Sequence, residues 1–150
     1  ISTILLIKWL TSDICDTTCL SLTLMFQKEV ADRIVAKTGS SKRSRISLIS
    51  ELYTNPKLVL NISSGSFIPK PKVDSALIYF EILKKPRYKI NQNRFKIIVE
   101  AAFNQKRKMI RSSLKNIFPN TKSVLQKVGI EETKRPQSID LKYFCDLSLI

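Results

Sequence analysis

Histidine is absent from this 150-residue chain, glycine is scarce, and acidic residues are outnumbered by basic ones. Without histidine, the chain has no Ser/His/Asp or Cys/His arrangement for nucleophilic catalysis and no Cys/His zinc site. The 3 glycines, Gly39, Gly65 and Gly129, lie too far apart for GxG spacing. These residues therefore contain no glycine-rich phosphate loop.

Cysteine and long hydrophobic runs are also limited. Cys15, Cys19 and Cys145 are odd in number and lack metal-type pairing, which indicates reduced thiols in a cytoplasmic protein without a metal. The apolar residues 1–10 are too few to span a bilayer and are interrupted by Lys8. Because the chain begins with Ile1 in the middle of an amphipathic pattern, we expect it to continue a longer protein.

Positive charge is abundant. Lys and Arg number 26 against 12 Asp and Glu, which gives a net charge of +14 and a pI near 9.9. Residues 1–85 contain 12 basic and 7 acidic side chains, and residues 86–150 contain 14 and 5. This excess predicts a polyanionic partner, with nucleic acid as the first choice. An anionic membrane surface is a poorer alternative because no long basic amphipathic helix with an aromatic apolar face is present.

The first part of the chain reads as an α/β domain. Apolar spacing predicts helices at residues 4–10, 30–35 and 47–53, and strands at 20–27, 57–62 and 73–83. The last strand is apolar on both faces, so we expect it to be covered on both sides. The proline-containing basic stretch 84–91 predicts a boundary between domains at residues 1–85 and 86–150.

The second part reads as a small all-helical domain. Helical spacing covers residues 95–103 and 109–117, either as one long helix or as two helices with a break at Asn104. Further helices fit residues 121–128, ended by Gly129, and 141–149, capped by Asp140.

The stretch SFIPKPKVDS, residues 66–75, has the most distinctive local composition. Pro69 and Pro71 make it stiff and non-helical, and Lys70 and Lys72 make it basic. Held in such a loop, Phe67 is suited to stacking on a nucleobase. Taken alone, these ten residues fit better a stiff connection whose phenylalanine fills the core.

Two clusters of basic side chains are further candidates for RNA contact. Arg107 and Arg111 are four residues apart and would share one face of a helix, which suits a phosphate backbone or simply a solvated surface. The weaker cluster lies in the loop before residue 46. The two clusters consist of Lys106, Arg107, Lys108, Arg111 and Lys115, and of Lys42, Arg43 and Arg45.

Several spaced motifs, in order, resemble the C-terminal part of the small-subunit ribosomal RNA adenine N6,N6-dimethyltransferases of the kasugamycin-resistance type. The matching segments run from residue 1 to the end of the chain, and FxPxPxVxS together with FNQ[KR]RK is the most specific pair. The segments are ISTILLIKWL, LMFQKEVADRI, GSSKRSRISL, SFIPKPKVDSAL, AAFNQKRKMIRSSLKN and RPQSIDLKYF.

The resemblance implies the later half of a Rossmann-like methyltransferase domain followed by a helical RNA-binding domain. It implies that Phe67 packs on the target adenine, within a loop completed by Pro69, Pro71, Val73 and Ser75, and that the basic residues above face RNA. The implied partners are small-subunit ribosomal RNA and the small ribosomal subunit. The implied cofactor of the whole enzyme is S-adenosylmethionine, whose glycine-rich loop and Asn-Leu-Pro-Tyr catalytic motif would precede Ile1.

We therefore expect the isolated chain to be inactive, to bind the cofactor weakly at best, and to be marginally stable. The alternative is a non-enzymatic RNA-binding remnant of a truncated gene. The nucleotides upstream of Ile1 would distinguish the two, because an intact frame with the cofactor loop favours the enzyme.

Overall fold

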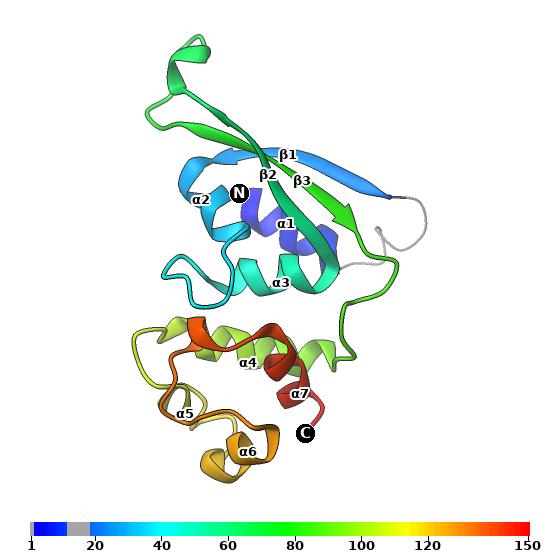
Figure 1. Cartoon of the computed structure of the whole chain (residues 1–150), viewed down its shortest axis with the longest axis vertical. Coiled ribbons are helices and arrows are strands. Elements are labelled where there is room, and N and C mark those ends of the chain that lie inside the picture. Colours follow the sequence, from blue (N-terminus) through cyan, green and yellow to red (C-terminus); the bar gives the residue numbers. More distant parts are fainter. Residues whose placement is uncertain (1, 12–18) are drawn as a thin grey trace. The chain divides into compact units, whose positions relative to one another are not determined.

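A computed structural model describes residues 2–11 and 19–150. Its contacts divide the chain into two compact units, which we call the sheet unit (residues 1–36 and 46–87) and the helical unit (residues 37–45 and 88–150). The elements are shown in Figure 1 and have the following bounds: α1 Ser2–Thr11, β1 Ser21–Gln27, α2 Lys28–Ile34, α3 Arg45–Tyr53, β2 Thr54–Ile62, the 3-10 turn η2 Ser64–Ser66, β3 Ser75–Ile82, α4 Gln92–Asn104, α5 Ile110–Ser113, α6 Thr121–Val128, the 3-10 turn η3 Pro136–Ser138 and α7 Leu141–Ser148.

The sheet unit contains an antiparallel sheet with strand order β1-β3-β2. The period of two in residues 20–27 is confirmed as strand β1, in which Phe26 is buried and Met25 is half exposed. β3 is the central strand, so its backbone is hydrogen-bonded on both sides. Its first residue, Ser75, lies opposite Gln27 of β1 and Ile62 of β2.

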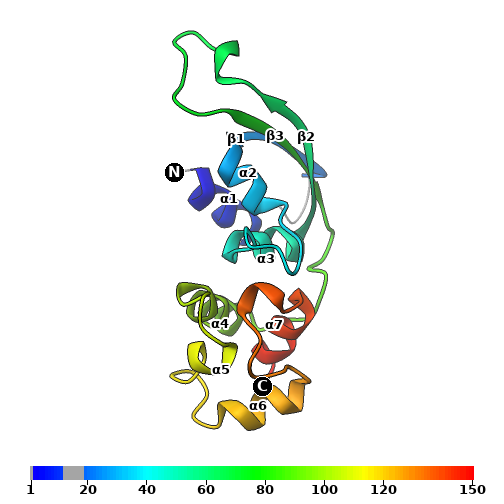
Figure 2. The same ribbon diagram turned by 60° about the vertical axis from the view of Figure 1, so that its left-hand side comes forward.

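One face of this sheet forms the core of the sheet unit. Ala76, Ile78 and Phe80 are fully buried, and the Phe80 ring lies edge-on to Phe26 with centroids 6.2 Å apart. Figure 2 shows α1, α2 and α3 on the same side of the three strands. Burial of each large apolar side chain there contributes about 1.5–3 kcal/mol.

The prediction that β3 is covered on both sides is wrong for the sheet unit. Its residues alternate between buried and half-buried, and Leu77 and Tyr79 lie on the more open face. An antiparallel sheet tolerates one solvated face, so apolar residues on both faces do not require two covering layers.

The helical unit is built on amphipathic helices. α4 buries Phe95, Ile98 and Val99, and the Asn91 side chain caps its start by accepting a hydrogen bond of 3.1 Å from the backbone N–H of Arg94. α6 ends as predicted at Gly129, whose φ of +84° favours glycine. Asp140 is at the N-cap position of α7, although its side chain forms no capping hydrogen bond.

Residues 37–45, which run from the loop after α2 to the first residue of α3, join the helical unit. The backbone N–H of Gly39 donates to the carbonyl oxygen of Gln137 at 2.8 Å, and the Lys106 ammonium donates to the carbonyl oxygen of Ser41 at 2.8 Å. From the sequence this loop was predicted to belong to residues 1–85, because the boundary was placed at the proline-containing stretch 84–91. Sequence order alone does not show that the loop packs elsewhere.

Two further expectations from the sequence concern the cysteines and membrane-spanning segments. Cys19 and Cys145 are free thiols, whereas Cys15 lies outside the described residues. Within residues 2–11 and 19–150, no helix combines the length and apolarity needed to cross a membrane.

Candidate functional site

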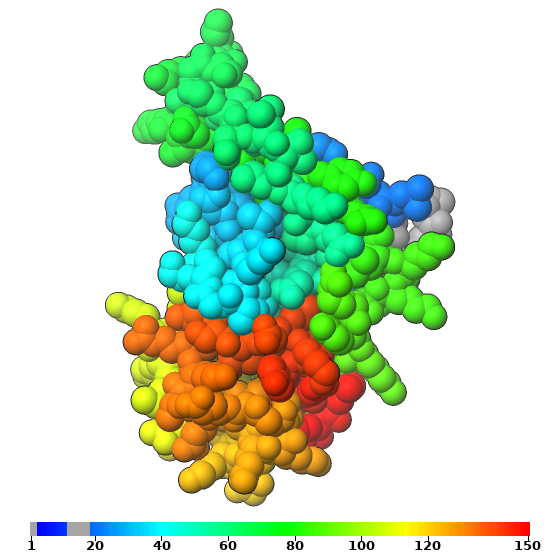
Figure 3. All heavy atoms as spheres, in the orientation of Figure 1, coloured from blue at the N-terminus to red at the C-terminus, as the bar shows by residue number. Residues whose placement is uncertain are grey.

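The stretch 66–75 lies in the connection between β2 and β3, which we call the tip loop (residues 63–74). In Figure 3 the tip loop (green) projects at the top, away from the helices of the sheet unit. The loop opens with η2, where the Ser63 hydroxyl accepts a hydrogen bond from the N–H of Gly65 at 3.3 Å. Ile68 and Pro69 are joined by a cis peptide bond.

A single carboxylate holds the two ends of the tip loop together. Asp74 accepts a hydrogen bond of 2.8 Å from the N–H of Ser64 through Oδ1, and its backbone carbonyl accepts one of 2.9 Å from the N–H of Lys28. The sequence analysis missed Asp74. An Asp immediately before a strand was the available signal, because short acidic side chains often bind nearby backbone N–H groups in turns.

The same contacts bring together two segments that match the family. Gln27 and Lys28 belong to QKEVA, and Asp74 and Ser75 belong to the FxPxPxVxS segment, 47 positions later in the chain. The end of β1 therefore fixes the base of the tip loop.

The tip loop presents apolar and cationic side chains to solvent. Ile68 is fully exposed, Val73 is about half exposed, and Lys70 and Lys72 are exposed. Phe67 is half-buried, which leaves part of its ring accessible. A partly accessible aromatic ring in a loop that also carries two exposed lysines suits stacking on bases and attraction of phosphates.

Pro69, Pro71 and Ser75 complete the predicted loop residues. Pro69 is exposed, whereas Pro71 and Ser75 are half-buried where the loop returns to β3. Pro69 and Pro71 restrict the backbone of the loop, because each proline fixes its own φ.

In the helical unit, the predicted basic residues have different surroundings. Lys106 donates to the carbonyl oxygens of Ser41 and Arg43, at 2.8 and 3.5 Å, so it holds residues 37–45 in place. Arg45 forms an ion pair of 3.4 Å with Glu100. Arg43 is only 1% exposed and does not present its guanidinium to solvent, unlike Lys42, which is exposed.

Arg107 and Arg111 do not share a helix face, which corrects the sequence analysis. α4 ends at Asn104 and α5 begins at Ile110, so the alternative with two helices is confirmed. The polar residues between them form a turn, in which the N–H of Lys108 donates to the carbonyl oxygen of Gln105 at 2.8 Å. They contribute no large apolar side chain that would keep them on the core-facing side of a longer helix.

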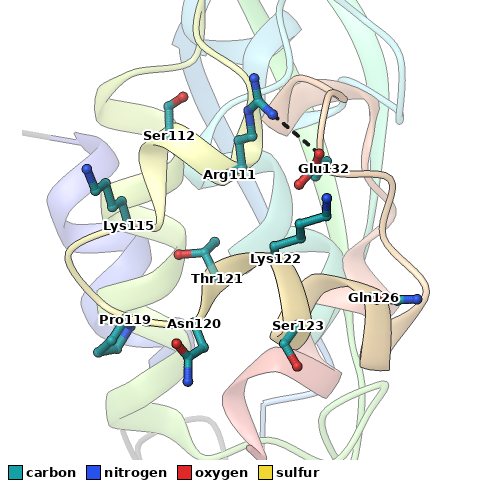
Figure 4. A pocket seen from close by; sticks show the side chains of 10 residues that line it. All are labelled: Arg111, Ser112, Lys115, Pro119, Asn120, Thr121, Lys122, Ser123, Gln126 and Glu132. Carbon is teal, nitrogen blue, oxygen red and sulfur yellow. Dashed lines mark hydrogen bonds and ion pairs between the residues drawn. The ribbon is translucent and has the colours of Figure 1, made fainter.

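Arg111 and Lys115 line a cavity of about 710 Å³ in the helical unit. In Figure 4, α6 supplies the other wall, including Lys122, and Arg111 points toward Glu132, with which it forms an ion pair of 3.3 Å. The sequence analysis missed Lys122, since nothing in its local pattern separates it from other surface lysines.

The described residues do not fit S-adenosylmethionine. A glycine cradle requires backbone so close to the ligand that a Cβ cannot be accommodated. Gly39, Gly65 and Gly129 lie singly in three separate segments, so they do not form such a cradle. In the part of the chain that the structure describes, no three His, Cys, Asp or Glu side chains are grouped to hold a metal either.

Comparison with known proteins gives the relationship directly. The family model described as ribosomal RNA adenine dimethylase matches residues 1–150. The chain is 45% identical to ribosomal RNA small subunit methyltransferase A of Cereibacter sphaeroides, over 99% of this chain and 53% of that protein, and 40% identical to the protein of that name from Ehrlichia ruminantium, over 99% and 55%. The chain therefore spans about half the length of the curated relatives it matches.

Solved structures show the same fold. A dimethyladenosine transferase from Plasmodium falciparum superimposes with a TM-score of 0.84 at 26% identity, over 99% of this chain and 62% of that chain. The 23S rRNA methyltransferase ErmE, with a TM-score of 0.64 at 21% identity over 99% and 59%, supports the fold alone. The predicted α/β class, as the later half of a Rossmann-like methyltransferase domain followed by a helical domain, is confirmed. By its match along residues 1–150, the chain belongs to the ribosomal RNA adenine dimethylase family.

Proposed function

We propose that this chain is the RNA-substrate part of an enzyme that transfers methyl groups from S-adenosylmethionine to N6 of adenines in small-subunit ribosomal RNA. The observation that carries the proposal is the family match over residues 1–150, combined with a tip loop in which Phe67 is partly accessible and Lys70 and Lys72 are exposed. The partner would be small-subunit ribosomal RNA, met on the small ribosomal subunit in the cytoplasm.

In this proposal the side chains of the chain bind and orient RNA. The Phe67 ring stacks on the target adenine after the base leaves its own stack, which suits an enzyme that must reach an exocyclic amine. Lys70 and Lys72 lie next to it in sequence and neutralise phosphates of the extruded nucleotide. Asp74 keeps the loop folded through its hydrogen bond to the N–H of Ser64.

The chain itself is not expected to transfer methyl groups. Its three glycines lack the close spacing of a cofactor loop, so the cofactor and the groups that position the adenine amine would come from outside these residues. Purified chain incubated with labelled S-adenosylmethionine and ribosomal RNA should leave the RNA unlabelled. Label on the adenines would contradict this part of the proposal.

Base stacking by Phe67 can be tested on the chain as it is. A small-subunit RNA hairpin carrying 2-aminopurine at an adenine should change its fluorescence when the chain binds, because the base exchanges its neighbours for Phe67. Phe67→Ala should abolish that change and weaken binding by roughly 5- to 150-fold, which corresponds to about 1–3 kcal/mol for one stacked base.

Ile68→Ala is the matched control, because Ile68 is the adjacent residue and is fully exposed. It should leave the fluorescence change intact, and Phe67→Trp should preserve it. An equal loss in Ile68→Ala and Phe67→Ala would show that the loop contributes surface only, without a stacking residue.

A further inference from the structure

We propose that the cavity between α5 and α6 binds a phosphodiester of the RNA backbone, with Lys115 and Lys122 as its principal cationic groups. The inference rests on the proposed function, since it assigns a second contact to the same RNA. The cavity has a volume of about 710 Å³ and lies wholly in the helical unit. Small-ligand sites are commonly 300–1,000 Å³, so a phosphate with its attached ribose would fit.

The charges that line the cavity favour an anion. Arg111, Lys115 and Lys122 contribute three positive charges and Glu132 one negative charge. Glu132 pairs with Arg111 at 3.3 Å, whereas neither Lys115 nor Lys122 forms an ion pair within the described residues. Two exposed ammonium groups on opposite walls therefore lack a fixed counter-charge.

The position of each ammonium group follows from the local fold. Lys115 lies two residues after the end of the short helix α5, and Lys122 is in the first turn of α6. The two elements are connected by a turn through Pro119 and Asn120, which also lines the cavity. Lys115 and Lys122, seven positions apart in sequence, therefore line the same cavity on either side of Thr121 (Figure 4).

Polar groups beside the lysines could complete phosphate binding. The hydroxyls of Ser112 and Ser123 line the cavity and are exposed, and each can donate to a phosphate oxygen. The Asn120 side chain makes no capping hydrogen bond, so a ligand oxygen could take the place of a cap at the start of α6. The positive end of the α6 dipole adds to the positive electrostatic potential of the cavity. The assignment itself rests on the cavity and on the two lysines that line it.

The cavity includes only part of the basic cluster expected from sequence, namely Arg111 and Lys115. That expectation grouped Arg111 and Lys115 with Arg107 on one helix, whereas the break after Asn104 puts Arg107 on a turn. In the structure, the cavity is lined by Lys122 of α6 together with Arg111 and Lys115, whereas Arg107 does not line it.

The salt dependence of RNA binding tests the proposal. Binding of a small-subunit RNA hairpin should be measured from 50 to 300 mM KCl for the chain and for Lys115→Gln/Lys122→Gln. Each lost phosphate contact should reduce the slope of log K against log [KCl] by about 0.7–1. We expect the double variant to lower the slope by about one to two and Lys122→Arg to retain it.

Lys127→Gln is the matched control, because Lys127 is an exposed residue of α6 that does not line the cavity. Its slope should equal that of the unaltered chain. The proposal is overturned if the double variant keeps the full slope, or if Lys127→Gln lowers the slope as much. Far-ultraviolet circular dichroism of each variant should remain unchanged, and a slope lost only together with helix content would also overturn it.

Free phosphate and RNA can be separated as sources of the bound group. Inorganic phosphate and adenosine monophosphate should shift the backbone amide resonances of Lys122 and Ser123 only weakly, while the RNA hairpin shifts them at far lower concentration. Tighter binding of free phosphate than of RNA would overturn the assignment to the RNA backbone. If the hairpin still gives the Phe67-dependent fluorescence change while the double variant keeps its slope, only the cavity proposal fails. If the hairpin does not bind at all, both proposals fail.

Discussion

Replacing Lys106 with glutamine should loosen residues 37–45 before it affects anything else in the chain. The Lys106 ammonium donates to the carbonyl oxygen of Ser41 at 2.8 Å, and more weakly to that of Arg43 at 3.5 Å. A hydrogen bond to a charged group contributes about 1.5–3 kcal/mol when well formed. Because Lys106 is half exposed, solvent weakens these hydrogen bonds, and we expect them to contribute about 1–1.5 kcal/mol.

Amide hydrogen exchange measures this effect directly. A loss of about 1–1.5 kcal/mol corresponds to roughly 5- to 12-fold faster exchange for a locally opening segment. The N–H of Gly39, which donates to the carbonyl oxygen of Gln137, and the N–H of Arg43, which donates to that of Ser40, are suitable probes. Exchange in strands β2 and β3 should stay unchanged, because these strands belong to the sheet unit.

Lys108→Gln is the matched control for Lys106. It removes the same charge two residues away, from an exposed side chain with no ion pair or side-chain hydrogen bond within the described residues. Unchanged exchange at Gly39 and Arg43 in Lys106→Gln, or equal acceleration in both variants, would refute the reasoning. RNA affinity measured on Lys106→Gln and Lys108→Gln separates support of residues 37–45 from RNA binding. Lys108 is expected to contact RNA only, whereas Lys106 also holds residues 37–45.

Three further substitutions test other parts of the structure. Phe80→Ala should lower the free energy of unfolding in urea by about 3–5 kcal/mol, because Phe80 is fully buried; Tyr79→Ala, on the more open face, should cost clearly less. Asp74→Ala should accelerate amide exchange at Ser64 by roughly tenfold, since it removes the carboxylate that accepts the N–H of Ser64 at 2.8 Å. Gly129→Ala should cost about 1–2 kcal/mol of unfolding free energy, because φ is +84° there while the nearest side chain leaves room for a methyl group.

Gly129→Ala and Asp74→Ala each have a matched control. Gly65→Ala should be close to neutral, because the backbone at Gly65 has no positive φ. Lys72→Ala removes an exposed side chain of the tip loop and should leave exchange at Ser64 unchanged. A cost at Gly65 equal to that at Gly129 would contradict the explanation by left-handed backbone, because a Gly→Ala change at a compatible position is otherwise neutral or stabilising.

Much of the fold could be predicted because the periodicity is local and strong. The change from a period of two to a helical period at Gln27 marks the junction of β1 and α2, and Gly129 marks the end of α6. Long-range packing could not be predicted in the same way. Leu77 and Tyr79 look like core residues, yet their exposure depends on which layers cover the sheet, and no single segment contains that information.

The candidate site shows the same limit. The tip loop was predicted as a stiff basic loop with an aromatic residue, since prolines act on their own backbone. The hydrogen bond of Asp74 is to Ser64, ten residues earlier in the chain, and the proposed role of Lys122 depends on a cavity that it shares with Lys115, seven residues earlier. The prediction that Phe67 stacks on adenine comes from the family resemblance and stays a prediction.

Because residues 37–45 pack with residues 88–150, the helical unit is assembled from two separate pieces of the chain, and the polypeptide passes between the units three times. A single proteolytic cut near residue 87 would therefore not release a complete helical unit. A fragment containing only residues 88–150 would leave the Lys106 ammonium and the Gln137 carbonyl without their partners at Ser41 and Gly39. In evolution, too, this unit could not be exchanged between proteins as one continuous stretch of gene.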